Sequence, residues 1–201
     1  MRASAVICAV ALAGYAAGLH AQSKRGAGPA KPVPSALAAA IDAEISNLEG
    51  QVVPLAEAMP EERYSFSPES LNIPGSVMKG VRTYALQVRH LAADNFAIWA
   101  PLTGKPEPAG IKAPAGPADM TGRTEILKFL KDSFVYAHRA AANLTIANEL
   151  DMVTFRGQSV TRLSLVALAL THAMDHYGQM VEYVRMVGVV PPGSQMKMSA
   201  P

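Results

Sequence analysis

The stretch THAMDHYGQM, residues 171–180, contains two histidines, His172 and His176, four residues apart. On an α-helix this spacing places both imidazoles on one face with their Cβ atoms about 6 Å apart, close enough to share one metal ion. Neutral imidazole suits zinc, nickel, iron or copper better than magnesium or calcium. Two partly buried histidines bonded to backbone or carboxylate groups would produce the same pattern, so the spacing alone is a weak indication of a metal site.

The residues around this pair exclude two known types of metal site. A zincin-type protease needs a glutamate directly after the first histidine, and that position is Ala173. A carboxylate-bridged di-iron bundle needs Glu-x-x-His, and no glutamate precedes a histidine by three residues. A site for a single ion remains, and it needs at least a third ligand. The apolar side of a helix expected over residues 76–99 offers one candidate, His90.

Hydrophobic residues recur at helical spacing in four segments, which predict helices over residues 35–59, 76–99, 124–146 and 161–187. Half of all residues are hydrophobic and only 6% are aromatic, which favours helix packing over a sheet. The stretch 101–122 holds five prolines and four glycines and is expected to form an irregular crossover, and residues 148–159 a polar link. The predicted fold class is therefore all-α, a four-helix bundle with an internal metal site.

Local features refine two of these helices. Ser35 is a candidate N-cap of the first helix, and Gly50 and Pro54 are expected to bend or fray its second half. The first half of the last helix, LSLVALAL (residues 163–170), is apolar all round and is expected to be deeply buried.

The ends of the chain differ from the helical part. Arg2 precedes an uncharged, largely apolar run and a small residue, Ala21, which is the layout of a secretory signal peptide. An uncleaved anchor is the alternative, but the run is short for a spanning helix. The predicted organisation is a signal peptide (1–21), a flexible linker (22–34), the helical domain (35–194) and a mobile tail (195–201). The protein is thus expected to be exported, to the periplasm or beyond.

The charge and the cysteine content restrict partners and chemistry. Lys and Arg number 18 against 16 Asp and Glu, with no basic run, so nothing favours a nucleic acid or stable membrane insertion after signal cleavage. The single cysteine, Cys8, lies in the signal peptide, so the mature protein would have neither a disulfide nor a thiol nucleophile. A small-molecule substrate, of unspecified kind, is the expected partner.

Four strings in the chain resemble the DinB-like (DNA-damage-inducible) superfamily over about residues 35–194: MPEERYSFSP (59–68), QVRHLAADNF (87–96), SVTRLSLVALALTHA (159–173) and THAMDHYGQMVEYVRMVGVVPP (171–192). The resemblance implies an up-down-down-up four-helix bundle, often a homodimer, with three histidines that hold a metal ion. Carried over by position, these are His90 on the second helix and His172 and His176 on the fourth. Members with known activity resemble metal-dependent thiol S-transferases, isomerases or hydrolases, and the cytosolic thiol chemistry of some does not suit an exported chain.

Three histidine ligands would leave a coordination position open for water or substrate. Asp94, four residues after His90, is the candidate catalytic residue, with a fourth ligand, a partner of a ligand or a solvated carboxylate as the alternatives. Asp175 is expected at the surface, and His138 is expected to be unrelated to the site.

The predicted function is an exported metal-dependent enzyme, of hydrolase or transferase type, that uses zinc or nickel, or else iron. The alternative is a non-catalytic metal-binding envelope or stress protein. A fourth protein ligand that closes the site would favour the second reading.

Overall fold

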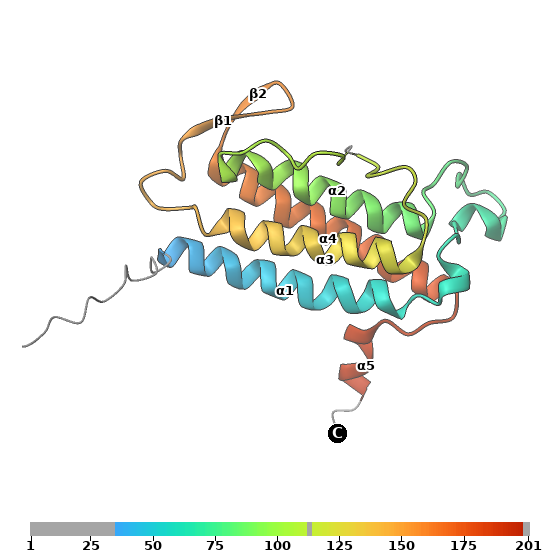
Figure 1. The fold of residues 1–201 in the computed structure, drawn as a ribbon. Coiled ribbons are helices and arrows are strands. Elements are labelled where there is room, and N and C mark those ends of the chain that lie inside the picture. The colour runs from blue at the N-terminus through green and yellow to red at the C-terminus, as the bar shows by residue number, and fades with distance from the viewer. Residues whose placement is uncertain (1–34, 112–113, 199–201) are drawn as a thin grey trace, which may run out of the picture. The chain divides into compact units, whose positions relative to one another are not determined.

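The computed structural model describes residues 35–111 and 114–198, so the predicted signal peptide and linker lie outside the described residues. Four long helices form the body: α1 (Ala36–Ala58), α2 (Tyr84–Thr103), α3 (Arg123–Ala141) and α4 (Arg162–Met186). The helices α1 and α4 run in one direction and α2 and α3 in the other (Figure 1). This is the up-down-down-up bundle that the resemblance implied. In the described residues, no helix is both long and apolar enough to cross a membrane.

Side-chain bonds to backbone carbonyls fix how the helices lie against each other. The Tyr84 hydroxyl, at the start of α2, donates to the carbonyl of Leu55 near the end of α1 (2.9 Å). The Tyr183 hydroxyl, near the end of α4, donates to the carbonyl of Arg82 just before α2 (2.9 Å). Arg162, the first residue of α4, donates to Leu102 near the end of α2 (2.9 Å). The helix α2 is therefore antiparallel to both α1 and α4.

The first helix follows its sequence pattern closely. Ser35 caps it by accepting from the amide of Ala38 (3.1 Å). Its buried residues are Ala38, Ile41, Ile45, Leu48, Val52, Val53, Leu55 and Ala56. The helix α1 continues through Gly50 and Pro54 to Ala58, so neither residue ends it.

The second helix is displaced along the chain from its predicted range. It begins at Tyr84 rather than Ser76, because Gly75 and Gly80 both adopt positive φ (78°) and form turns. The Thr83 side chain then caps the helix, and Val77, expected in its apolar row, is 92% exposed. At the other end, α2 runs through Pro101 to Thr103 instead of ending at Trp99.

A β-hairpin replaces part of the expected polar link. Strands β1 (Met152–Phe155) and β2 (Gln158–Thr161) pair antiparallel, with Phe155 opposite Gln158. The two residues between them, Arg156 and Gly157, both have positive φ, as a tight type I′ hairpin turn requires. The hairpin packs against the end of the bundle where α2 stops and α4 begins (Figure 1).

The last helix buries one face rather than its whole circumference. It packs on α1 and α2, and its buried residues are Leu165, Val166, Ala169, Ala173, His176, Met180, Tyr183 and Val184. Leu163 (37% exposed) and Leu168 (39% exposed) point away from these neighbours, so the expectation of burial all round was wrong. Beyond α4, residues Pro192–Met198 form the short helix α5 where the sequence predicted the domain to end. Proline suits the first turn of a helix, where its missing N–H costs nothing.

Candidate metal centre

The structure brings together the three histidines that the sequence singled out. His90 comes from α2 and His172 and His176 from α4, and one ligand nitrogen of each lies within 4.8 Å of the others. The Nε2 atoms of His172 and His176 are 3.0 Å apart. The His90 ring lies 5.2 Å from the His172 ring and 4.5 Å from the His176 ring between centroids. His90 and His176 are buried and His172 is partly buried, so the cluster lies just inside the bundle surface.

The three histidines differ in what their outer ring nitrogens contact, and His90 has the hydrogen bond expected of a metal ligand. Nδ1 of His90 lies 2.5 Å from the carbonyl oxygen of Pro114, and a carbonyl can only accept. His90 therefore carries its proton on Nδ1, which leaves the lone pair of Nε2 directed to the cluster. The amide nitrogen of Gln87, Nε2, lies 2.6 Å from Nδ1 of His176 and donates to Oε1 of Gln179 (2.6 Å). Nδ1 of His172 is buried and has no hydrogen-bond partner among the described residues.

His90 and His176 are kept neutral, which is the state that binds metal ions. Burial, together with the like charges of His172 and His90, lowers the pKa of His176 to about 4. Burial also lowers the pKa of His90, although its bond to Pro114 acts in the opposite direction. Two of the three rings therefore have free lone pairs at neutral pH.

Asp94 adds a buried negative charge beside the cluster. It is 3% exposed, and its Oδ2 lies 3.2 Å from Nε2 of His172 and 3.9 Å from Nε2 of His90. Its Oδ1 accepts a hydrogen bond from Nη2 of Arg156, at the tip of the hairpin (2.9 Å). Burial alone would raise the pKa of Asp94, but the hydrogen bond from His172 and the charge of Arg156 outweigh it and lower the pKa. The carboxylate is therefore ionised and favours a cation at the cluster.

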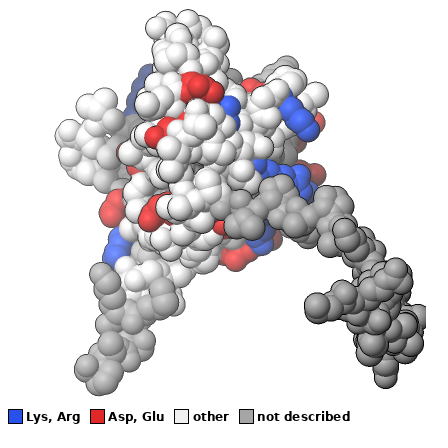
Figure 2. Space-filling view, turned by 90° about the vertical axis from the view of Figure 1, so that its left-hand side faces the viewer, with Lys and Arg blue, Asp and Glu red and all other residues white. Residues whose placement is uncertain are grey.

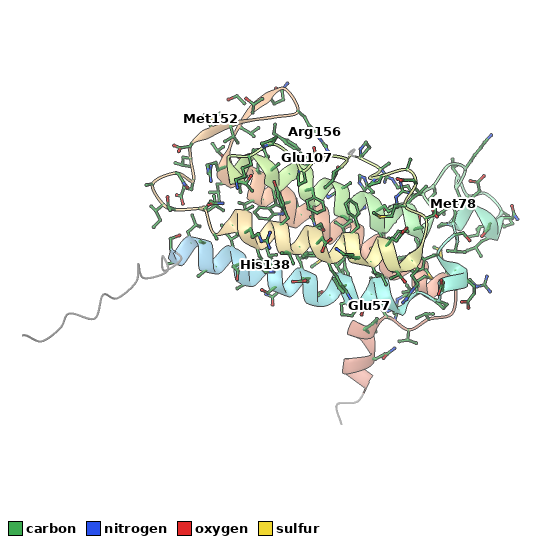
Figure 3. All side chains as sticks on the ribbon, in the orientation of Figure 1. Glu57, Met78, Glu107, His138, Met152 and Arg156 are labelled. Atoms are coloured by element: carbon green, nitrogen blue, oxygen red, sulfur yellow. The ribbon has the colours of Figure 1, made fainter. Side chains whose placement is uncertain are left out.

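Two other candidates lie outside the cluster, as the sequence predicted. His138, on α3, bonds through its two ring nitrogens to Asp42 (2.6 Å) and Glu49 (3.2 Å) of α1 (Figure 3). Asp175 is exposed and accepts a hydrogen bond from the amide of Gln179 (2.9 Å).

Sequence reasoning missed two residues that contact the cluster. Gln87 lies three residues before His90, so helical spacing alone could have indicated it. Arg156 lies in a loop 62 residues from Asp94, and no local pattern connects the two.

Three imidazoles with an adjacent carboxylate match the ligand types of zinc and of other borderline transition metals. The convergent ring nitrogens, the adjacent carboxylate and the oriented ring of His90 fit a divalent ion, so the arrangement is a candidate site for one.

Comparisons with known proteins agree with this architecture. A crystal structure of a DinB-like protein from Bacillus cereus ATCC 10987 matches with a TM-score of 0.58 at 14% identity, covering 76% of this chain and 93% of that one. At that identity the likeness shows the fold alone. No curated protein matches the sequence significantly. The model of the DinB superfamily matches residues 45–180, a span that includes His90, His172 and His176. The chain therefore belongs to the DinB superfamily.

Proposed function

We propose that this protein is an exported metal-dependent enzyme of hydrolase or transferase type that holds one divalent transition metal ion on His90, His172 and His176. Zinc or nickel suits three imidazoles best, and iron also fits. The observation that carries the proposal is the convergence of three imidazole nitrogens within 4.8 Å beside a buried, ionised carboxylate. A cluster of this composition costs folding free energy unless it binds something, because its polar groups are withdrawn from water.

A divalent ion held by three imidazoles supplies Lewis acidity, which polarises a substrate and can lower the pKa of a water molecule to about 7. The protein's own residues supply the rest. Asp94, ionised and next to His172, is placed to accept the proton of an attacking nucleophile. Arg156 holds the other oxygen of that carboxylate and so limits its rotation.

The second candidate function is a non-catalytic metal-binding protein of the cell envelope. The position of Asp94 favours this second function, because a carboxylate 3.2 Å from Nε2 of His172 could complete a closed, four-ligand site. Closed tetrahedral sites are typical of structural zinc, whereas catalytic zinc keeps a position open. Metal-edge X-ray absorption of the loaded protein separates the two functions by counting protein ligands against water.

The metal content of purified variants tests the site itself. His172→Ala or His176→Ala should reduce bound metal to near zero, because the two remaining imidazoles cannot hold the ion against the solvent. Asp94→Asn should retain metal with an affinity about 10–100-fold lower, as expected for a residue that supports the ligands. The matched control is His138→Ala, which removes a histidine outside the cluster and should leave the metal content unchanged. Stoichiometric metal in His172→Ala would refute the site.

We further propose export with loss of residues 1–21, supported by the charged, apolar and small-residue layout of the N-terminus. Intact mass of the protein recovered outside the cytoplasm should correspond to a chain that begins at Gln22. A cytoplasmic protein that still begins at Met1 would rule out this part of the proposal. We also expect a small-molecule substrate and a homodimer. Sedimentation of the same material measures the oligomeric state.

A further inference from the structure

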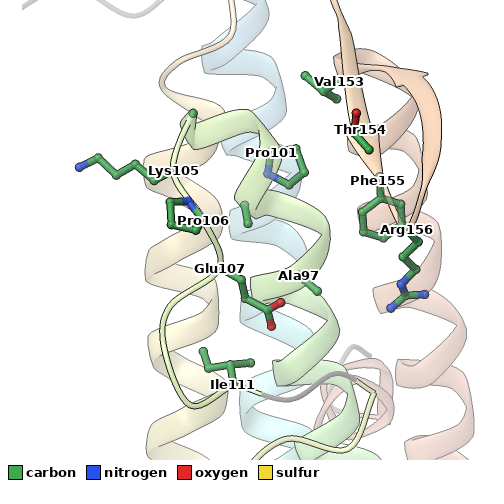
Figure 4. Close-up of a pocket in the computed structure, with 12 residues that line it drawn as sticks. Ala97, Pro101, Lys105, Pro106, Glu107, Ile111, Val153, Thr154, Phe155 and Arg156 are labelled. Carbon is green, nitrogen blue, oxygen red and sulfur yellow. The ribbon is translucent and has the colours of Figure 1, made fainter.

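A groove lies beside the candidate metal centre, between the hairpin and the crossover that follows α2. It has a volume of about 980 Å³, and its walls come from α2, from the crossover and from the hairpin (Figure 4). The apolar part of the lining includes Pro101, Ile111, Val153 and Phe155, and charged residues line the rest. This size is typical of sites for small molecules.

The cation that faces this groove is Arg156. Its side chain is 54% exposed, and its guanidinium lies 4.9 Å from the centre of the Phe155 ring. Among the described residues it donates one hydrogen bond, to Asp94, although a guanidinium has five N–H donors. Lys105 also lines the groove but extends away from the hairpin (Figure 4). The unused edge of the Arg156 guanidinium is therefore free to bind an anion.

The backbone conformation at Arg156 is unusual for a residue of this size. Its φ is +49°, in the left-handed region that bulky residues rarely adopt. A type I′ turn of two residues prefers Asn followed by Gly, and this chain has Arg followed by Gly. Strained positions of this kind concentrate at functional sites, where the side chain compensates for the backbone.

The opposite wall of the groove carries a carboxyl group without a partner. Oε1 of Glu107 is buried and has no hydrogen-bond partner among the described residues. Its side chain points from the crossover toward the gap between α2 and the hairpin (Figure 4). A buried oxygen of this kind can bond a ligand group that fills the groove, and a protonated carboxyl can also donate to a ligand anion.

We propose that this groove binds the carboxylate of a small organic acid with an apolar body, and that Arg156 is the residue that anchors it. The inference rests on the proposed function, because it names the substrate class of the same site. Two contacts connect the groove to the cluster: Arg156 binds Asp94, and Asp94 contacts His172, so a carboxylate on the free edge of Arg156 is linked to the histidines through these two side chains. The apolar residues of the groove then contact the apolar body of the bound acid.

The test is calorimetry of the purified protein with butyrate and 3-phenylpropionate, and with the neutral amide of each acid as a control probe. Each acid should bind at least about tenfold more tightly than its amide, and 3-phenylpropionate more tightly than butyrate, because part of the groove lining is apolar. Arg156→Asn should lower the affinity for both acids about tenfold or more, the usual effect of losing a charge-assisted hydrogen bond. Asn-Gly suits the turn and offsets part of the stability lost with the Arg156–Asp94 bond, so this variant should still fold. Arg63→Asn removes the same charge from an exposed site on the loop before α2 and should change nothing.

Three outcomes would overturn the inference: no binding of the acids, equal affinity for acid and amide, or unchanged affinity in Arg156→Asn. Titration of the same samples with zinc separates this result from the proposed function. If zinc binds and the acids do not, the groove inference fails and the metal site stands. If the acids bind and zinc does not, the groove inference stands and the proposed metal site fails. If Arg156→Asn changes the zinc affinity alone, Arg156 only positions Asp94 and the inference fails.

Discussion

Single residues in the interior of this bundle divide into two groups by how their polarity is compensated. Asn95 on α2 and Ser133 on α3 are buried and hydrogen-bond each other (3.1 Å), so this bond compensates for the burial of their polar groups without a ligand. The histidine cluster is different, because Nδ1 of His172 has no partner among the described residues and the Asp94 carboxylate lies against two imidazoles. A buried polar atom without a partner destabilises a fold by about 1–3 kcal/mol. The ionised Asp94 carboxylate beside the imidazoles is the physical reason to expect a bound cation.

His138 makes a pH-dependent contribution to stability that is independent of the metal. Burial lowers its pKa, but the Asp42 and Glu49 carboxylates outweigh that effect and raise the pKa above its usual value near 6.5. A raised pKa in the folded state means that the stabilisation is fully present below about pH 6.5 and is lost as the pH rises through the folded-state pKa. His138→Gln should therefore reduce the free energy of unfolding at pH 5, by at most about 1 kcal/mol because the carboxylates are half exposed.

Urea unfolding of wild type and His138→Gln, with a chelator present, measures this difference. The two proteins should be nearly equal in stability at pH 9, where the imidazole is neutral. A difference that is the same at pH 5 and pH 9 would show that the ring acts by packing and not by charge.

The residues of the site were predictable to different degrees. The spacing of His172 and His176 placed them on one helix face but was a weak indication of a site, and the family resemblance then identified both, with His90, as a ligand set. Asp94 was identified by its position one turn after His90, but only the structure shows its contact with Arg156. That contact depends on where the hairpin packs against the bundle, and no pattern within either segment carries this information.

At the scale of elements, the centres of the helices were predicted better than their ends. Apolar spacing extended the second helix to Ser76 because Val77 and Val81 fit the pattern, whereas two glycines with positive φ and the Thr83 cap determine its true start. The hairpin was missed for a related reason: its turn is Arg-Gly, not the usual Asn-Gly, and its strands have four residues each. Periodicity reports which face is buried, whereas capping and turn geometry decide where an element stops.

The junction between α1 and α2 offers a test at this scale. The hydroxyl of Tyr84 is buried and donates to the carbonyl of Leu55, so it holds the start of α2 against the end of α1. Tyr84→Phe should lower the free energy of unfolding by about 1–2 kcal/mol, because it removes one buried bond and leaves a carbonyl without its donor. Tyr136→Phe is the matched control, since that hydroxyl is 3.5 Å from its nearest partner, Thr103, and its loss should cost less than about 0.5 kcal/mol. Equal losses in the two variants would contradict this role of Tyr84.

For the whole molecule, the topology is what makes a site possible. His90 and His172 are far apart in the chain and meet because α2 and α4 run antiparallel, with the bonds of Arg162 and Tyr183 at either end of the contact. Charged side chains of both signs are interspersed on the face seen in Figure 2, in keeping with the small net charge of +2. The four-helix fold could therefore be predicted from periodicity and resemblance, but the groove could not. It forms where the crossover and the hairpin approach α2, and both are segments without regular sequence patterns.

Metal binding should stabilise the whole bundle, because the ligands come from two helices that unfolding separates. An ion that binds only the folded state adds RT ln(1 + [metal]/Kd) to the free energy of unfolding, about 2.7 kcal/mol at a hundredfold excess over Kd. For a domain of this size that corresponds to a rise in Tm of about 5–10 °C.

His90→Ala should remove most of this rise, since α4 alone would then supply the ligands. The metal-free variant should stay helical, because the apolar faces of α1 to α4 supply the fold. Circular dichroism melts with and without zinc or nickel, for wild type, His90→Ala and the control His138→Ala, measure the effect. An equal metal-induced shift in wild type and His90→Ala would mean that α2 contributes no ligand, and the site would then be confined to the pair on α4.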